Sequence, residues 1–113
     1  MSVASAILSI VATATLAVAG DWGFTGFEQI LCQGDGPVGF GDQVAYGCTN
    51  LGTSATIMSV QGDVDGFEIL LYSEDNCGGS YMQTIRDSGT CSSAGRGDFP
   101  QIRSFEVVEG TPY

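Results

Sequence analysis

The stretch Tyr72–Gly79, with the sequence YSEDNCGG, decides the fold. An aromatic residue is followed by four residues, a cysteine, one residue and a glycine. The hydrophobic segment 67–71 precedes this stretch, and the strand-like segment 81–85 follows it. The same spacing occurs 45 positions earlier in Phe27–Gly34, FEQILCQG. Strands joined by a glycine-containing turn, present twice, predict a β-rich domain built from two related halves.

The repeat continues beyond this stretch at the same offset. Four further pairs of positions carry identical or similar residues: Phe40 and Ile85, Asp42 and Asp87, Ile57 and Ile102, and Ser59 and Ser104. A unit of this length, present twice, is unlike the many short units of a solenoid. We therefore expect residues 24–62 and 67–108 to form two like-connected units of four strands.

Strand-like segments separated by turns rich in Gly, Asp and Asn cover most of the chain after residue 19. The segments are residues 24–31, 38–46, 56–60, 67–72, 81–85 and 102–108. The Ser- and Gly-rich stretch Cys91–Gly97 is expected to be a surface loop. Since no segment after residue 19 shows a sustained helical period, we predict an all-β sandwich with little helix. Alternation assigns the following residues to the core: Phe67, Ile69, Leu71, Phe105 and Val107.

The first 19 residues have the composition of a secretion signal. They carry no charged side chain, include an apolar run at residues 6–18 and end in Ala17-Val18-Ala19, a small-x-small cleavage site. The alternatives are a membrane anchor or a buried helix, although the apolar run is short for a span. We predict a signal peptide over residues 1–19 and a single domain over residues 20–113.

The chain is strongly acidic, with a formal net charge of −10, three arginines and no histidine. Such a surface repels phosphate groups and anionic lipid. The charge therefore argues against nucleic-acid binding and against binding to an anionic membrane.

Four cysteines in a short exported chain predict two disulfides, for which three pairings exist. The repeat favours Cys32–Cys48 and Cys77–Cys91, one bridge inside each half. Four thiolates could instead bind zinc, but the sequence has no CxxC pair and export favours oxidation.

The repeated pattern resembles the Greek-key motif of the βγ-crystallin superfamily, with a later serine that begins a hydrophobic strand. The residues that carry this resemblance are Phe27, Gly34 and Ser59 in the first half, and Tyr72, Gly79 and Ser104 in the second. It implies a left-handed backbone at each glycine and a hydrogen bond from each serine onto the folded-over hairpin. Cysteine replaces the family's second aromatic residue. The chain is also similar to small, cysteine-containing, effector-like proteins that filamentous fungi secrete.

The resemblance raises the question of calcium, which many microbial members bind through two adjacent Asn or Asp residues four and five positions before the motif serine. Those positions hold Phe99-Pro100 and Ser54-Ala55, which supply no carboxylate. We therefore expect no metal or other cofactor. The remaining candidates for a weak cation site are acidic residues in predicted turns: Asp63, Asp65, Glu74 and Asp75.

Catalysis is not expected from this sequence. A chain without histidine has no Ser-His or Cys-His nucleophile system. Paired carboxylates such as Glu74 and Asp75 could hydrolyse glycosides, but no feature of the sequence places a pair across a cleft. We predict a protein that is not an enzyme.

A binding surface is the remaining expectation. Trp22 and Tyr81 lie at the ends of predicted elements and are candidates for exposed aromatic contacts, whereas most aromatics of a small β domain fill its core. Arg96-Gly97-Asp98 is a short tripeptide that can serve adhesion receptors.

The function most consistent with these features is that of a secreted interaction protein whose partner is an unknown extracellular protein or polysaccharide. One alternative is a killer-toxin-like antimicrobial or a protease inhibitor. Another is a structural or stability protein that binds calcium weakly.

Overall fold

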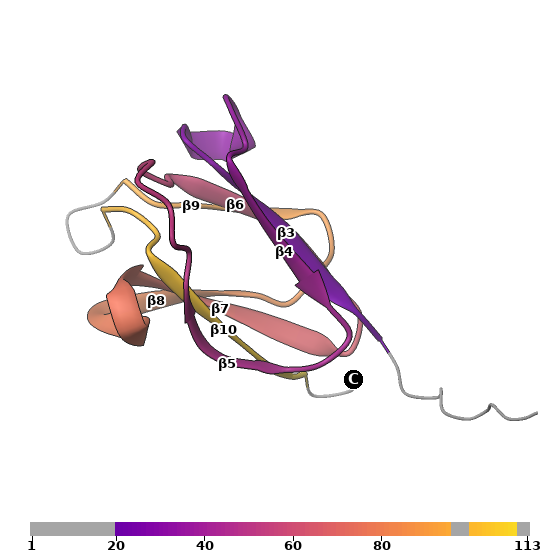
Figure 1. Ribbon diagram of the computed structural model, residues 1–113. Helices are drawn as coiled ribbons and strands as arrows, with labels where there is room; N and C mark the ends of the chain where they lie inside the picture. Colours follow the sequence, from indigo (N-terminus) through magenta and orange to yellow (C-terminus); the bar gives the residue numbers. More distant parts are fainter. Residues whose placement is uncertain (1–19, 96–99, 111–113) are drawn as a thin grey trace, which may run out of the picture.

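Two four-stranded antiparallel sheets pack face to face in the computed structural model, which describes residues 20–95 and 100–110, without the side chains of residues 80–82 (Figure 1). The strands are β3 (Trp22–Phe27), β4 (Val38–Asp42), β5 (Tyr46–Asn50), β6 (Ser59–Val64), β7 (Phe67–Glu74), β8 (Gly78–Ile85), β9 (Thr90–Ser93) and β10 (Ser104–Glu109). Two single-turn 3-10 helices follow β3 and β7, namely η2 (Ile30–Cys32) and η3 (Asp75–Cys77). The described residues form no α-helix, so the predicted all-β class is confirmed.

The strand order relates the two halves of the sequence to each other. One sheet has the order β4-β3-β6-β9 and the other the order β8-β7-β10-β5. The first, second and fourth strands of each half therefore share a sheet, and the third strand crosses to the sheet of the other half. Each sheet therefore contains three strands from one half and one strand from the other, so neither half completes a sheet alone.

Backbone hydrogen bonds follow the same correspondence. Met58 N donates to Phe27 O at 2.8 Å, and at the offset of 45 residues Arg103 N donates to Tyr72 O at 2.9 Å. Ile57 and Ile102, the residues just before these donors, pair with each other in an isolated antiparallel bridge. The two halves thus contact each other at these isoleucines.

The core lies between the sheets and is centred on Phe105, which is fully buried. Its ring packs edge-on against Phe24 with 4.9 Å between the centroids and lies 4.8 Å from Phe40 and 5.9 Å from Trp22. Ile69, Leu71 and Val107 are buried with it, as alternation predicted, while Phe67 is half-buried at the margin. Aromatic rings from both sheets therefore fill one continuous core.

The predicted strand over 38–46 was wrong. The segment 38–46 is not one strand but parts of β4 and β5, which belong to different sheets. The turn between them is fixed by Asp42, whose Oδ1 accepts from Gln43 N at 2.7 Å and whose Oδ2 accepts from the Tyr46 hydroxyl at 2.6 Å. The hydrogen bond from Tyr46 and that from Gln43 lower the pKa of Asp42.

The second error concerns the segment 91–97, which was expected to be a loop. Residues 90–93 form β9, which pairs with β6 from Ser59↔Ser93 to Gly62↔Thr90. The short polar side chains of β9 give no alternation, so its strand character comes from pairing rather than from local pattern.

The predicted disulfide pairing was also wrong. The bridges are Cys32–Cys91 and Cys48–Cys77, so each joins one half of the sequence to the other. The cause is the crossing of the third strands, because β5 carries Cys48 and β9 carries Cys91 into the opposite sheet. The prediction that all four cysteines form disulfides is confirmed.

The predicted signal peptide, residues 1–19, lies outside the described residues. Within the part of the chain that is described, no helix has the length and apolar character needed to span a bilayer. The two disulfides indicate an oxidising environment of the extracellular kind.

Candidate functional site: two equivalent corners

The hairpins β3–β4 and β7–β8 each end in a corner built on the same unusual backbone. Leu31 and Cys32 have φ angles of 63° and 56°, and Asn76 and Cys77 have φ angles of 60° and 57°. Two consecutive left-handed residues are uncommon in L-amino acids because Cβ approaches the carbonyl oxygen. The sequence had predicted an extended strand through Leu31, and the structure corrects this prediction.

Each corner also contains the motif glycine in a conformation that disfavours side chains. Gly34 has a φ of 85° and Gly79 a φ of 104°. A Cβ at Gly79 would lie only 2.4 Å from Ser73 Oγ. The chain can therefore fold back over the sheet at this point only where the residue has no side chain.

A buried serine holds each corner onto its sheet. Ser59 Oγ accepts a hydrogen bond from Cys32 N at 2.8 Å and donates one to Gln29 O. Ser104 Oγ likewise accepts from Cys77 N at 2.9 Å and donates to Glu74 O. Both serines are fully buried, and each hydroxyl bonds two backbone groups of its corner, one as acceptor and one as donor.

The third strand of the opposite half supplies two further ties to each corner. Cys32 is bonded to Cys91 of β9, and Leu31 N donates to Ser93 Oγ at 2.9 Å. In the second corner Cys77 is bonded to Cys48 of β5, and Asn76 N donates to Asn50 Oδ1 at 2.7 Å. The two corners therefore share backbone, serine, disulfide and capping acceptor, and differ in the side chains that they display.

The aromatic residue that begins each motif is half-buried beneath its corner. Burial raises the pKa of Tyr72, and the carboxylate of Glu106, which lies 3.3 Å from the tyrosine hydroxyl, raises it further. The phenol is therefore neutral at physiological pH and donates a hydrogen bond to Glu106. Phe27 has no such group in the first half.

The corner at η3, which we call the polar corner, consists of Asp75, Asn76, Asn50 and Arg103. Arg103 makes a bidentate ion pair with Asp75, in which Nη2 donates to Oδ2 at 3.0 Å and Nε donates to Oδ1 at 3.3 Å. Both side chains are nearly half exposed, 43% for Arg103 and 47% for Asp75. The guanidinium therefore already neutralises the carboxylate that points into the solvent here.

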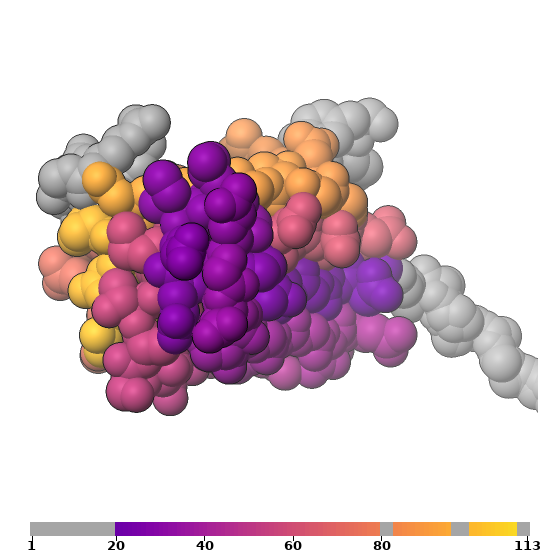
Figure 2. All heavy atoms as spheres, turned by 90° about the horizontal axis from the view of Figure 1, so that it is seen from above, coloured from indigo at the N-terminus to yellow at the C-terminus, as the bar shows by residue number. Residues whose placement is uncertain are grey.

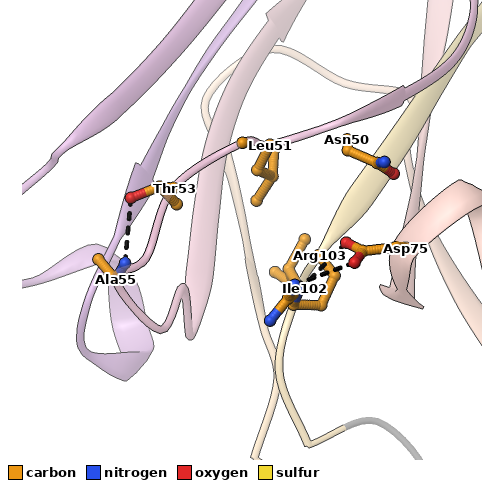
Figure 3. A pocket seen from close by; sticks show the side chains of 8 residues that line it. Asn50, Leu51, Thr53, Ala55, Asp75, Ile102 and Arg103 are labelled. Carbon is orange, nitrogen blue, oxygen red and sulfur yellow. Dashed lines mark hydrogen bonds and ion pairs between the residues drawn. The ribbon is translucent and has the colours of Figure 1, made fainter.

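A shallow hollow of about 170 Å³ adjoins the polar corner (Figure 3). Leu51 and Ile102 form its apolar part, and Asn50, Asp75 and Arg103 line its rim. Its volume is below that of typical small-molecule pockets, roughly 300–1,000 Å³. Its rim offers amide, carboxylate and guanidinium groups that can hydrogen-bond one small polar group.

The corner at η2, which we call the apolar corner, consists of Ile30, Leu31 and Met58. Ile30 is 48% exposed and Leu31 is 64% exposed. The ideal Cβ position of Gly95 lies 3.7 Å from both Ile30 Cγ2 and Met58 Cε, so these two side chains converge over Gly95. Figure 2 looks onto this hairpin and shows its purple residues on the near face of the molecule.

Sequence reasoning missed the residues that distinguish the corners, although the repeat contains the signal. At the offset of 45, Ile30 aligns with Asp75, Leu31 with Asn76, and Met58 with Arg103. All three pairs exchange an apolar residue for a polar one. Comparing the repeats for differences, rather than for matches, would have identified them.

Trp22, a candidate for the exposed surface, is instead buried, with only 3% of its surface exposed. It lies in β3 with its ring on the core side, and its Nε1 donates to Val44 O at 2.7 Å. The prediction failed because β3 begins at Trp22 rather than at Phe24. The Tyr81 side chain and residues Arg96 and Asp98 lie outside the described part of the structure.

The four acidic candidates for a cation site do not gather in one place. Asp63 is in β6 and Asp65 is in the turn between β6 and β7, so both lie near the start of β7. Glu74 ends β7 and Asp75 begins η3, and the eight residues of β7 span roughly 25 Å. Asp63 Oδ1 already accepts from Gly89 N at 3.0 Å. Nowhere in residues 20–95 and 100–110 do three metal-ligating side chains come together.

The chain was compared with known proteins. No family model matches the sequence, and neither the curated proteins nor the solved structures contain a match.

Proposed function

We propose that this chain is a secreted protein without catalytic activity that acts by binding an extracellular protein or polysaccharide. The observation that carries the proposal is the contrast between the two corners. In the polar corner the left-handed position is occupied by Asn76, a residue that tolerates this conformation. In the apolar corner the same position is occupied by Leu31, which is strained there and exposed to solvent. An exposed, conformationally strained apolar residue is a sign of function rather than of stability.

Other features support the same proposal. The two disulfides suit an oxidising compartment, and residues 1–19 have the composition of a secretion signal. No histidine is present to act as a general base. The hydrophobic faces of both sheets are committed to the core, which leaves hairpins and loops to carry specificity.

We further propose that the scaffold is a double Greek-key unit of the βγ-crystallin kind that arose by duplication. The exchange of third strands, the paired glycines and the paired serine contacts support this relationship. The binding function does not depend on it, because the corners are defined by their own contacts.

A pull-down with the secreted chain tests the proposed function. The bait is the purified protein with both disulfides, and the samples are extracellular fluid and insoluble cell-wall polysaccharides. We expect saturable retention of one component, confirmed with that component in purified form. Retention of nothing from either sample contradicts the proposal. Growth inhibition of a yeast or bacterium, or inhibition of a protease, would instead favour the toxin or inhibitor alternative.

A further inference from the structure

We propose that the apolar corner is the contact surface, and that its partner is a basic protein with an apolar pocket rimmed by lysine or arginine. This inference rests on the proposed binding function and assigns the surface and the chemistry of the partner. The polar corner serves as the internal reference, because it has the same backbone and different side chains.

The left-handed backbone at position 31 favours a residue other than leucine. Leu31 and Asn76 have nearly the same backbone, with φ and ψ of 63° and 26° against 60° and 33°. Asparagine tolerates this region, whereas leucine is strained there. Leu31 is 64% exposed, so core packing does not compensate for the strain. A contact made outside the molecule explains why leucine stands here.

Several bonds hold the backbone of the apolar corner in place. The backbone N–H groups of Leu31 and Cys32 donate to Ser93 and Ser59, and Cys32 is bonded to Cys91. These ties fix two consecutive backbone positions of the hairpin end, Leu31 and Cys32. A backbone that is already ordered in the free protein loses little conformational entropy on binding, which favours affinity.

The apolar surface at this corner is larger than one side chain. Leu31 does not stand alone, since Ile30 is 48% exposed beside it and Met58 converges with Ile30 over Gly95. A projecting group of aliphatic side chains and a flexible methionine suits insertion into a pocket of a partner. The corresponding positions of the polar corner, Asp75, Asn76 and Arg103, would not enter such a pocket without loss of hydration.

The negative charge at and around the apolar corner favours a basic partner. Glu28 and Asp35 are exposed on the hairpin of the apolar corner and are joined by a backbone hydrogen bond of 3.0 Å from Glu28 N to Asp35 O. The whole chain carries a net charge of −10. A second copy of the chain or an anionic membrane would bring like charges together, whereas a basic surface would be attracted.

A selection with a phage-displayed library of random short peptides tests the proposal. The full secreted chain, with both disulfides, is the immobilised target. We expect the selected peptides to combine an aromatic or aliphatic residue with lysine or arginine. Their affinity should fall at least about tenfold for Leu31→Asn and remain unchanged for Asp75→Asn, a substitution at the exposed tip of the polar corner. Asparagine suits the left-handed backbone, so the Leu31→Asn variant should fold, and its chemical unfolding separates a loss of binding from a loss of structure.

Several results would overturn the proposal. They are no enrichment, selection of acidic or uncharged peptides, and equal binding to the Leu31→Asn variant. Self-association in sedimentation that Leu31→Asn abolishes would assign the corner to a second copy, and binding to phosphatidylserine vesicles would assign it to a membrane. A contact between the Leu31 methyl groups and residues 96–99 in the NMR spectrum of the free protein would show that the chain itself covers the corner.

The pull-down separates this proposal from the proposed function. If Leu31→Asn retains the captured component as well as the wild-type chain does, the protein is a binding protein but its surface lies elsewhere. If the wild-type chain retains nothing, both proposals fail.

Discussion

The polar and apolar corners are two solutions to one structural problem. Each must reverse the chain between a pair of strands and lie flat against a sheet, and each does so with two left-handed residues and a buried serine. The side chains at the tip differ completely, aliphatic in one corner and charged or amide-bearing in the other. The comparison therefore separates the positions that build the hairpin from those that are free to serve a function.

The positions common to both corners are those whose atoms face the sheet or the opposite half. They are the glycines Gly34 and Gly79, the serines Ser59 and Ser104, and the bridged cysteines Cys32 and Cys77. The free positions point away from the sheet and are exposed. Substitutions at the common positions should have equal effects in the two corners, and substitutions at the free positions should not.

The disulfides should give the largest effect. Replacing Cys32 and Cys91 together by serine opens a loop with a sequence separation of 59, which corresponds to a loss of about 4 kcal/mol in the chain-entropy model. Replacing Cys48 and Cys77 together opens a separation of 29 and should cost slightly less, about 3.5 kcal/mol. Urea unfolding monitored by the fluorescence of Trp22 measures both changes.

A further double variant checks the pairing itself. Replacing Cys32 and Cys48 by serine removes one partner from each bridge and should leave two free thiols, because the bridges join the halves. A protein with an intact Cys77–Cys91 bridge and no free thiol would contradict the exchange of third strands. Thiol titration under denaturing conditions distinguishes the two results.

The serines should give the next largest effect, and an equal one. Ser59→Ala removes the hydroxyl that bonds the N–H of Cys32 and the carbonyl of Gln29, and Ser104→Ala removes the equivalent hydroxyl in the other corner. Each should lower the free energy of unfolding by about 2–3 kcal/mol. Ser54→Ala, on an exposed residue of the loop before β6, is the control and should change stability by less than about 0.5 kcal/mol. A large difference between Ser59→Ala and Ser104→Ala would show that the corners are not equivalent supports.

At the free positions the two corners should respond in opposite directions. Leu31→Asn should raise the free energy of unfolding by about 1 kcal/mol, since asparagine suits the left-handed region better than leucine. Asn76→Leu should lower it by at least as much, because it also loses the hydrogen bond from Asn50 Nδ2 at 3.3 Å. Chemical unfolding of both variants measures the signs. If Leu31→Asn destabilises the protein, leucine at this position supports the fold and the argument for an external contact fails.

The same comparison shows what the sequence could predict. Strand class, the core face of β7 and β10 and the positions of the repeat follow from alternation and spacing, which are local properties. The pairing of the cysteines does not, because it depends on which sheet the third strands join. Cys48 and Cys91 are 43 rather than 45 positions apart, which indicates a small length change within the repeat but does not identify the partner of either cysteine.

The candidate site was less predictable for a related reason. Trp22 was assigned to the surface from its place before the first predicted strand, but β3 begins earlier and turns its ring into the core. Ile30 and Leu31 read as the end of a strand, because isoleucine and leucine are ordinary strand residues and the left-handed turn is imposed by Ser59 and Cys91 from elsewhere in the chain. Long-range ties therefore determine which apolar residues are exposed.

The ion pair of the polar corner should give the smallest effect, since both partners are exposed. Asp75→Asn should lower the free energy of unfolding by no more than about 0.5 kcal/mol at low ionic strength, and the difference should vanish in about 1 M salt. The loss is partly offset because the substitution also removes one negative charge from a chain of net charge −10. Glu28→Gln in the apolar corner removes the same charge from a residue without an ion pair in the described structure, so it isolates that general term.

The difference between these two variants, measured by urea unfolding at several salt concentrations, is the contribution of the Asp75–Arg103 pair. If Asp75→Asn costs several kilocalories and salt does not reduce the cost, Asp75 would be a structural element of its corner. Asp75 would then support the hairpin as the serines and cysteines do, unlike Leu31. The exposed tip residues would no longer be dispensable to the fold in both corners. If the cost is small and screened by salt, the polar tip is as dispensable to the fold as the apolar one, and the chemistry of each is available for recognition.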